Sequence, residues 1–133
     1  MVWPLEWQLF TFWHNRLSVK LNSMNIEKKI DYTHIKVDEK TFSKFYSAYK
    51  KMETQLSAEH IIIEFSDNLN STNEEISLFL NVSKLHQKQK TSFVIVSSSA
   101  DIDEFPEDFN IVPTLGEAED VLEMEAIERD LGF

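Results

Sequence analysis

The side chains with the clearest chemical capacity are the hydroxyls of Ser71 and Thr72, which follow an apolar segment and precede an amphipathic one. Ser71 with Glu74, or Thr72 with Glu75, has the spacing of a capping box, in which the hydroxyl accepts a hydrogen bond from a backbone N–H and the carboxylate reaches back. A hydroxyl at a helix N-terminus is also a natural phosphoacceptor, because the helix dipole and the free N–H groups stabilise a phosphate dianion. Two interpretations therefore stay open, a structural cap and a phosphoacceptor on Ser71 or Thr72, although the two glutamates would repel the phosphate.

No other group of residues has the spacing of a catalytic, metal or cofactor site. The chain has no Cys, which excludes thiolate ligands and cysteine nucleophiles and favours a reducing cytoplasm as its location. Only Gly116 and Gly132 occur, so a glycine-rich phosphate loop is excluded. The histidines are isolated, with no His-x-His pair, and we expect His60 and His86 at the surface. We therefore expect no enzyme activity, no metal and no cofactor.

Charge is concentrated at the C-terminal end of the chain. Residues 101–133 hold 12 of the 23 acids and one of the 13 bases, a net charge of −11, so the formal net charge of −10 belongs to this segment and the rest of the chain is almost neutral. An acidic surface repels nucleic acid and anionic membranes. The sequence also has no apolar run of about 18 residues that could span a bilayer. The composition therefore indicates a protein partner, with no nucleic acid and no membrane span.

Apolar residues remain within the acidic segment and fall on two sides of the helix predicted there. The first stripe is formed by Leu115, Ala118, Val121 and Leu122. The second stripe, on nearly the opposite side, is formed by Met124, Ile127 and Leu131 and is edged by Glu123, Glu125, Glu128 and Asp130. One straight helix cannot bury both stripes against one sheet. We predict that the first half packs on the domain while the second half projects its stripe to bind a partner; a bend that folds both stripes onto the core is the alternative.

From residue 24 onward, the hydrophobic periodicity alternates between strand and helix. Extended segments are predicted at 26–37, 60–65, 93–96 and 111–113. Helices are predicted at 41–56, at 72–88 and over the acidic segment after residue 113, with a short helix or turn at 101–108. This order indicates an α/β architecture, a single domain with a four- to five-stranded, mostly parallel sheet and helices packed on it. A chain of 133 residues is long enough for one core and too short for two.

The helix predicted at 72–88 has a broader apolar surface than contact with one sheet requires. One stripe is formed by Ile76, Phe79 and Leu80, and the second by Leu78, Val82 and Leu85. Either neighbouring helices cover the second stripe, or a partner protein does. The residues of this second stripe are therefore candidates for partner binding.

Residues 1–23 differ in composition from the rest, because all three Trp lie among them. Their aromatic residues recur at helical spacing, which is typical of an amphipathic helix that binds an interface or a partner, including a second copy of the chain. Packing on the domain is another interpretation. A third, which we favour, is that residues 1–23 are upstream sequence and that Met24 is the initiator, because an ordinary strand pattern begins there. The expected division is an aromatic extension, 1–23, and a domain, 24–133, that ends in the acidic helix.

The order of these elements from residue 24 to residue 133 resembles the STAS domain of anti-sigma-factor antagonists. In that family a buried strand is followed by the motif Asp-Ser-Ser/Thr-Gly, and here Asn70-Ser71-Thr72-Asn73 occupies the corresponding place. Asn70 stands where the family has Asp, and Asn73 with Glu74 stands where it has Gly-Leu. The resemblance implies a STAS-like regulatory domain, a phosphoacceptor at Ser71 or Thr72, and an anti-sigma factor or a kinase-like regulator as the partner.

Residues 128–133 also resemble the ends of small bacterial STAS-like proteins that often carry a ribonuclease Z label. Ribonuclease Z has the metallo-β-lactamase fold and needs a His-x-His-x-Asp-His cluster to hold two zinc ions. The isolated histidines of this chain do not form that cluster. An RNA-processing or accessory role is therefore the second expectation for function, without the nuclease chemistry.

Overall fold

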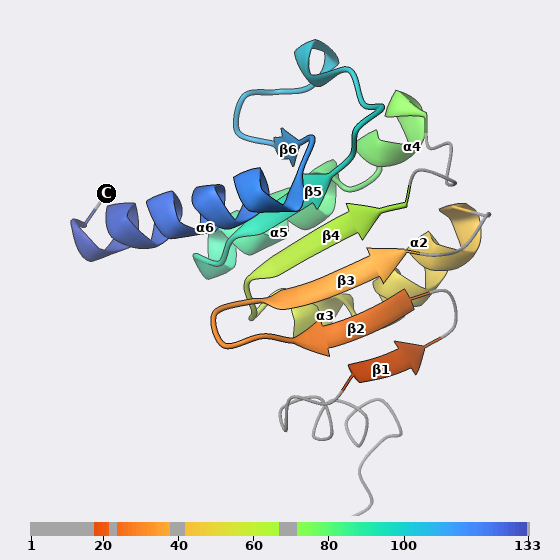
Figure 1. Ribbon diagram of the computed structural model, residues 1–133, viewed down its shortest axis with the longest axis horizontal. Helices are drawn as coiled ribbons and strands as arrows, with labels where there is room; N and C mark the ends of the chain where they lie inside the picture. The colour runs from red at the N-terminus through yellow and green to blue at the C-terminus, as the bar shows by residue number, and fades with distance from the viewer. Residues whose placement is uncertain (1–17, 22–23, 38–41, 67–71, 133) are drawn as a thin grey trace, which may run out of the picture.

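The computed structural model of the chain describes residues 18–21, 24–37, 42–66 and 72–132 (Figure 1). Over these residues, six strands form one sheet in the order β1-β2-β3-β4-β5-β6. The strands are β1 (Ser18–Leu21), β2 (Met24–Lys28), β3 (Thr33–Val37), β4 (Ile61–Phe65), β5 (Phe93–Val96) and β6 (Asn110–Val112). β1 with β2, and β2 with β3, pair antiparallel, whereas the pairs from β3 to β6 are parallel.

This architecture confirms the prediction of a single α/β domain with a mostly parallel sheet. From residue 24 onward the sheet has five strands, β2 to β6, in agreement with the predicted four to five. β1 adds a sixth strand, because Ser18 pairs with Glu27 and Leu21 pairs with Met24. The expected boundary at Met24 therefore falls inside a β-hairpin. Residues 1–17, which include the three Trp, and residues 22 and 23 lie outside the described residues, and the choice of initiator stays a prediction.

The central strands are buried on both faces, as their β-branched residues predict. In β4, Ile61 and Ile63 belong to the core on one face and Ile62 to the core on the other, because successive side chains of a strand alternate. β5 is buried along its whole length and pairs with β4 in parallel register. The sheet therefore has a larger core on one face and a smaller core on the other.

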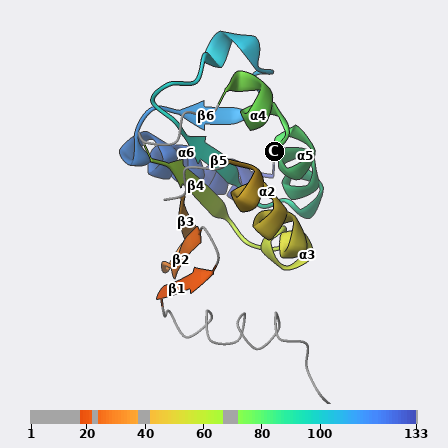
Figure 2. The ribbon, with the colours of Figure 1, turned by 90° about the vertical axis from the view of Figure 1, so that its right-hand side faces the viewer.

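The larger core is covered by α2 (Phe42–Lys51), α3 (Glu53–Leu56), α4 (Asn73–Ser77) and α5 (Leu80–Gln89). These helices lie in the crossovers from β3 to β4 and from β4 to β5. Right-handed crossovers that move in one direction along a sheet place their helices on the same face. Figure 2 shows α2, α3 and α5 together on one side of the sheet. The helices predicted at 41–56 and 72–88 are each divided in two, the first at Met52 and the second at Leu78 and Phe79.

The smaller core is covered by α6 (Leu115–Asp130) alone among the described helices. The helix begins at a cap, in which Thr114 Oγ1 accepts a hydrogen bond from the N–H of Glu117 at 3.2 Å. It buries Ala118 and Leu122 against β4 and β5. On β3 the same face of the sheet is polar, with His34 Nε2 2.9 Å from Glu64 Oε1. α6 therefore leaves the antiparallel side of this face open, beside the turn between β2 and β3.

Candidate functional site

The outer side of α6 and its last turn carries a stripe of exposed apolar side chains. Met124 is 61% exposed, Ile127 53% and Leu131 66%. On the inner side, Ala118 and Leu122 are buried. The two predicted stripes therefore face different ways. The alternative in which a bend folds both stripes onto the core is wrong, because α6 is one continuous helix and its second stripe is exposed. We call Met124, Ile127 and Leu131 the outer stripe.

The acidic rim of the outer stripe is smaller than the sequence indicates. Glu123, Glu128 and Asp130 are exposed, as predicted. Glu125 is partly buried instead, and its Oε2 accepts a hydrogen bond from Asn110 Nδ2 at 2.9 Å. Glu125 is thus a structural contact between α6 and β6, and its place in a partner-binding rim is corrected.

The second half of α6 is bonded to the sheet on its inner side. Besides the bond from Asn110 to Glu125, Arg129 Nη1 donates a hydrogen bond to Ser92 Oγ at 3.1 Å, just before β5 begins. Figure 1 shows α6 running back along β5 toward that end of the strand. The second half of α6 therefore does not project away from the sheet as an arm, and that prediction is wrong. Both halves of the helix pack or bond against the sheet on the inner side, and the outer stripe is exposed on the other side.

Thr72 caps α4. Its Oγ1 accepts a hydrogen bond from the N–H of Glu75, and its own N–H donates to Glu75 Oε1, both at 3.1 Å, which confirms a capping box at this pair. Thr72 is exposed, and its hydroxyl also lies 3.4 Å from Glu75 Oε1. Ser71 lies outside the described residues. The cap accounts for Thr72 without any further role, and the phosphoacceptor at Ser71 or Thr72 stays a prediction.

Asn73 links α4 to a short 3-10 helix, η1 (Ile102–Glu104). Its Nδ2 donates to Glu104 Oε2 at 2.6 Å, and its Oδ1 accepts from the N–H of Asp101 at 3.1 Å. These two hydrogen bonds give the side chain of Asn73 a structural role in this chain. The two hydrogen bonds join the segment after β4 to the segment after β5.

The second stripe of the helix predicted at 72–88 is mostly covered by the protein itself. Val82 is 1% exposed and belongs to the larger core, Leu85 is half-buried, and Leu78 is 46% exposed. The division between α4 and α5 explains this, because residues on either side of it do not share one straight helix face. Val82 is therefore unavailable to a partner, and Leu78 is the exposed member of the set.

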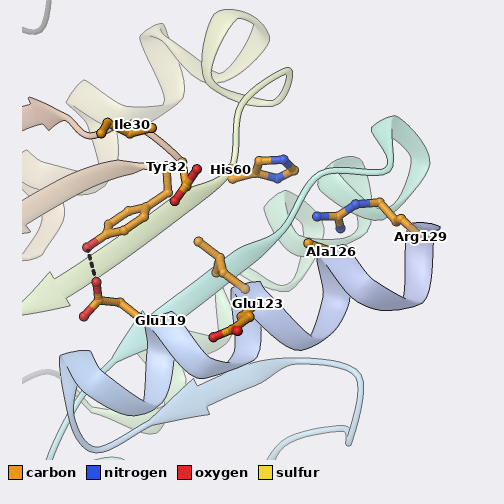
Figure 3. Close-up of a pocket in the computed structure, with 9 residues that line it drawn as sticks. Ile30, Tyr32, His60, Glu119, Glu123, Ala126 and Arg129 are labelled. Atoms are coloured by element: carbon orange, nitrogen blue, oxygen red, sulfur yellow. Dashed lines mark hydrogen bonds between the residues drawn. The ribbon is translucent and has the colours of Figure 1, made fainter. Parts of the chain in front are cut away.

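A cleft that the sequence did not indicate lies on the inner side of α6 (Figure 3). Its volume is about 680 Å³. One wall is formed by the turn between β2 and β3, with Ile30, Asp31 and Tyr32, and by His60 before β4. The other wall is the face of α6 with Glu119, Leu122, Glu123, Ala126 and Arg129. These residues come from segments far apart in the chain, and no motif connects them.

The polar groups of the cleft are oriented by hydrogen bonds. The hydroxyl of Tyr32 donates to Glu119 Oε2 at 3.1 Å, and burial together with this bond raises the pKa of Tyr32 to about 12. His60 Nδ1 accepts a hydrogen bond from the N–H of Ser92 at 2.9 Å. Burial, and next the positive charge of Arg129, lower the pKa of His60. At neutral pH the ring is therefore uncharged and carries its proton on Nε2.

The other histidine expected at the surface, His86, is buried. It is 1% exposed, its Nδ1 lies 2.7 Å from Thr91 Oγ1, and its ring stacks on Phe93 with 5.0 Å between the ring centroids. Burial, with a smaller contribution from His60, lowers the pKa of His86 to about 4. In the described part of the chain, no group of three or more His, Cys, Asp or Glu side chains is placed to hold a metal ion.

Two further observations bear on the class of the protein. Among the helices of residues 18–21, 24–37, 42–66 and 72–132, none is long and apolar enough to cross a membrane. The resemblance to STAS domains stays a prediction from the order of elements and the turn after β4. A comparison with models of known protein families found no match for the chain, and a comparison with curated proteins found no significant match either.

Proposed function

We propose that this protein is a non-catalytic interaction module that docks a protein partner through the outer stripe of α6. The observation that carries the proposal is the exposure of Met124, Ile127 and Leu131, each more than half exposed, on a helix whose other side is packed. Their spacing of three and four residues places them on one side of the helix, the pattern with which helices dock into apolar grooves. Large apolar side chains gathered on one surface are typical of interaction sites.

The charges around the outer stripe define the kind of partner. Glu123, Glu128 and Asp130 edge the stripe. Arg129, the one base of residues 101–133, is bonded to Ser92 on the inner side. An apolar surface with an acidic rim complements an amphipathic helix whose apolar side chains are flanked by Lys and Arg. We propose a partner of that chemistry, and the STAS resemblance favours an anti-sigma factor or a kinase-like regulator.

Regulation would act through Ser71 or Thr72. A phosphate on Thr72 would replace the hydroxyl that caps α4 and would stand beside the carboxylate of Glu75. Repulsion between the two anions would open the capping box and weaken the first turn of the helix. Mass spectrometry of the protein from its native cell tests this version. A phosphorylated Ser71 or Thr72 supports it, and unmodified protein under all growth conditions contradicts it.

Location and the alternative function follow from the sequence. The absence of Cys supports the reducing cytoplasm as the proposed location. The alternative is the RNA-processing or accessory role that the C-terminal resemblance implies. Zinc analysis and an assay of tRNA-precursor cleavage decide between the two functions, because cleavage that co-purifies with the chain would replace the interaction proposal.

Affinity capture followed by quantitative binding tests the docking surface. The tagged chain captures proteins from its native cell, and each purified candidate is titrated against the wild type, Ile127→Asp and Ile102→Asp. Ile102 is an apolar residue of η1 that is 50% exposed, so it serves as the matched control. We expect Ile127→Asp to lose at least about tenfold in affinity and Ile102→Asp to bind as the wild type does.

The charge of the partner gives a second readout. Affinity for a basic partner should fall as the salt concentration rises, because salt screens the acidic rim. Equal binding by Ile127→Asp and the wild type would contradict the docking surface. Self-association of the chain that Ile127→Asp abolishes would replace the proposed partner with a second copy of the same protein.

A further inference from the structure

The cleft on the inner side of α6 has groups of opposite charge at its two ends. Figure 3 shows His60 and Arg129 close to one end, and the hydrogen-bonded pair of Tyr32 and Glu119 at the other. The face of α6 between them contributes Ala126 to the lining. A ligand that follows the helix would therefore meet donors at one end and acceptors at the other.

One buried residue, Ser92, orients both donors of the first end. Its N–H donates to His60 Nδ1 at 2.9 Å, which leaves the proton of His60 on Nε2 as a donor. Its Oγ accepts from Arg129 Nη1 at 3.1 Å, and a guanidinium has further N–H groups for a ligand. Among the described residues, the ion pairs found do not include Arg129. His60 and Arg129 together therefore match the acceptor pair of a carboxylate.

The other end of the cleft is acidic. Glu119 Oε2 accepts a hydrogen bond from the Tyr32 hydroxyl, and an ionised carboxylate can accept several hydrogen bonds in all. Glu123 and Asp31 add further carboxylates to the lining. This end favours a ligand cation such as an ammonium group. A purely anionic ligand is disfavoured, because the lining of the cleft contains three carboxylates and only one guanidinium, that of Arg129.

We propose that this cleft binds a small zwitterion, an aliphatic amino carboxylate whose carboxylate lies against His60 and Arg129 and whose ammonium group lies near Glu119. Leu122 and Ala126 also line the cleft and would pack against the methylene chain of the ligand. The cleft and the outer stripe share only Glu123, which lines the cleft and edges the stripe, so this site does not depend on Met124, Ile127 or Leu131.

The helix sets the length of the ligand. Each residue of a helix rises about 1.5 Å, so Glu119 and Arg129, which are ten residues apart, lie about 15 Å apart along the axis of α6. Arg129 is the longer side chain and leans toward the N-terminus of the helix, and each ionic contact itself spans about 3 Å, so the ligand has to bridge only part of this distance. Several methylene groups therefore separate the two charges of the ligand, in contrast to an α-amino acid, where one carbon carries both.

An NMR titration of the full chain with 6-aminohexanoate, hexanoate, hexylamine and 1,5-diaminopentane tests the proposal. We expect 6-aminohexanoate to bind at least about tenfold more tightly than each probe that carries only one kind of charge. Arg129→Gln should weaken binding of the zwitterion at least about tenfold, and Glu119→Gln should weaken it as well. Lys88→Gln, at an exposed base of α5, and Glu128→Gln, on the outer side of α6, are matched controls that should bind as the wild type does.

The outcomes that would overturn the proposal are measured on the wild type and on two Arg129 variants, so that a loss of binding is not confused with a loss of folding. Equal affinity for any single-charge probe, or no shift of the Tyr32 and His60 resonances with any probe, would overturn it. Arg129→Gln also removes the bond to Ser92, so Arg129→Lys, which keeps the charge, provides a second variant with an expected intermediate affinity. Wild-type affinity in both Arg129 variants would overturn the carboxylate end. Ile127→Asp should bind the zwitterion normally, so the cleft and the docking surface succeed or fail separately.

Discussion

His86 is a histidine that the fold holds in its neutral form. Its ring is buried against Phe93, and its Nε2 has no hydrogen-bond partner among the described residues. A charged ring at this place would lose its hydration without an acceptor to replace it. The pKa of His86 in the folded protein is therefore about 4, well below the ordinary value of 6.5.

We expect the burial of His86 to make the protein less stable in acid. The folded pKa is the lower one, so the unfolded chain binds the proton first; the stabilisation is complete above about pH 6.5 and is lost as the pH falls toward about 4. A shift of this size corresponds to a loss on the order of 3 kcal/mol. Urea unfolding at about pH 7 and about pH 4.5 measures it in the wild type and in His86→Phe. The carboxylates titrate in the wild type and in His86→Phe alike, so His86 accounts only for the difference between them. If the free energy of unfolding of both proteins fell equally from about pH 7 to about pH 4.5, His86 would not be the cause.

Residue-level prediction succeeded at the Thr72–Glu75 capping box, where local spacing decides, and failed at His86, which was expected at the surface. The burial of His86 can be read from its position four residues after Val82, because the two share one face of α5. The lysines near His86 in the sequence obscured that spacing. The contacts of Ser92 with His60 and Arg129 have no such signal, since they join three segments that only the folded sheet brings together.

The cap of α4 gives a test at the scale of one element. Thr72→Ala should lower the free energy of unfolding by about 1 kcal/mol, because it removes the acceptor of the Glu75 N–H and breaks the capping box. Thr72→Ser keeps the hydroxyl and should restore most of the stability. Ser43→Ala, at an exposed position of α2, is the control and should change stability by less than about 0.5 kcal/mol. Urea denaturation measures all three, and an equal loss for Ser43→Ala would remove the cap as the explanation.

The two halves of α6 should differ in their contribution to stability. A chain that ends at Glu123 keeps the buried Ala118 and Leu122 and loses the hydrogen bonds of Glu125 and Arg129, each worth about 1 kcal/mol. We expect this shortened chain to fold with that modest loss. Leu122→Ala in the full chain should be at least as destabilising, at about 2 to 4 kcal/mol, because it leaves a cavity under the helix. Circular dichroism with urea unfolding measures both, and an unfolded shortened chain would show that the second half is required for the fold.

The breaks within predicted helices have a packing cause. The wide apolar surface predicted for one helix at 72–88 belongs to two helices, α4 and α5. Phe79, at the division, is fully buried and its ring packs against those of Tyr49 and Phe93. An apolar surface broader than one helix needs can therefore indicate that the segment is divided into two helices, and periodicity alone does not locate the division.

For the whole molecule, the larger core depends on an aromatic cluster around Phe79. Phe79 lies between the rings of α2, including Phe45 at 5.7 Å between centroids, and the ring of Phe93 on β5 at 6.1 Å. Phe79→Ala should lower the free energy of unfolding by about 3 to 5 kcal/mol, because it opens a cavity between the sheet and two helices. Phe105→Ala, at a partly buried ring on the edge of the same core, should be less destabilising. Equal losses in urea unfolding would mean that the cluster relaxes to fill the cavity.

The fold as a whole could be predicted because its central strands carry a strong signal. β4 and β5 are short runs of β-branched and aromatic residues, and helical patterns separate them. β1 was missed because its four residues follow a segment of unusual composition. The cleft was missed for a different reason, since a cleft arises from the placement of three elements and leaves no periodicity in any of them.

The order of the strands has a consequence for how the protein is made. In the described chain each strand lies beside the one synthesised just before it, so no strand has to enter between two that are already paired. Contacts between neighbours in the sequence form early and quickly, and the sheet can grow while the chain leaves the ribosome. α6 is synthesised after all six strands and closes the second face. The cleft and the outer stripe therefore come into existence together after the six described strands have been made, and a nascent chain offers neither to a ligand nor to a partner before α6 has been synthesised.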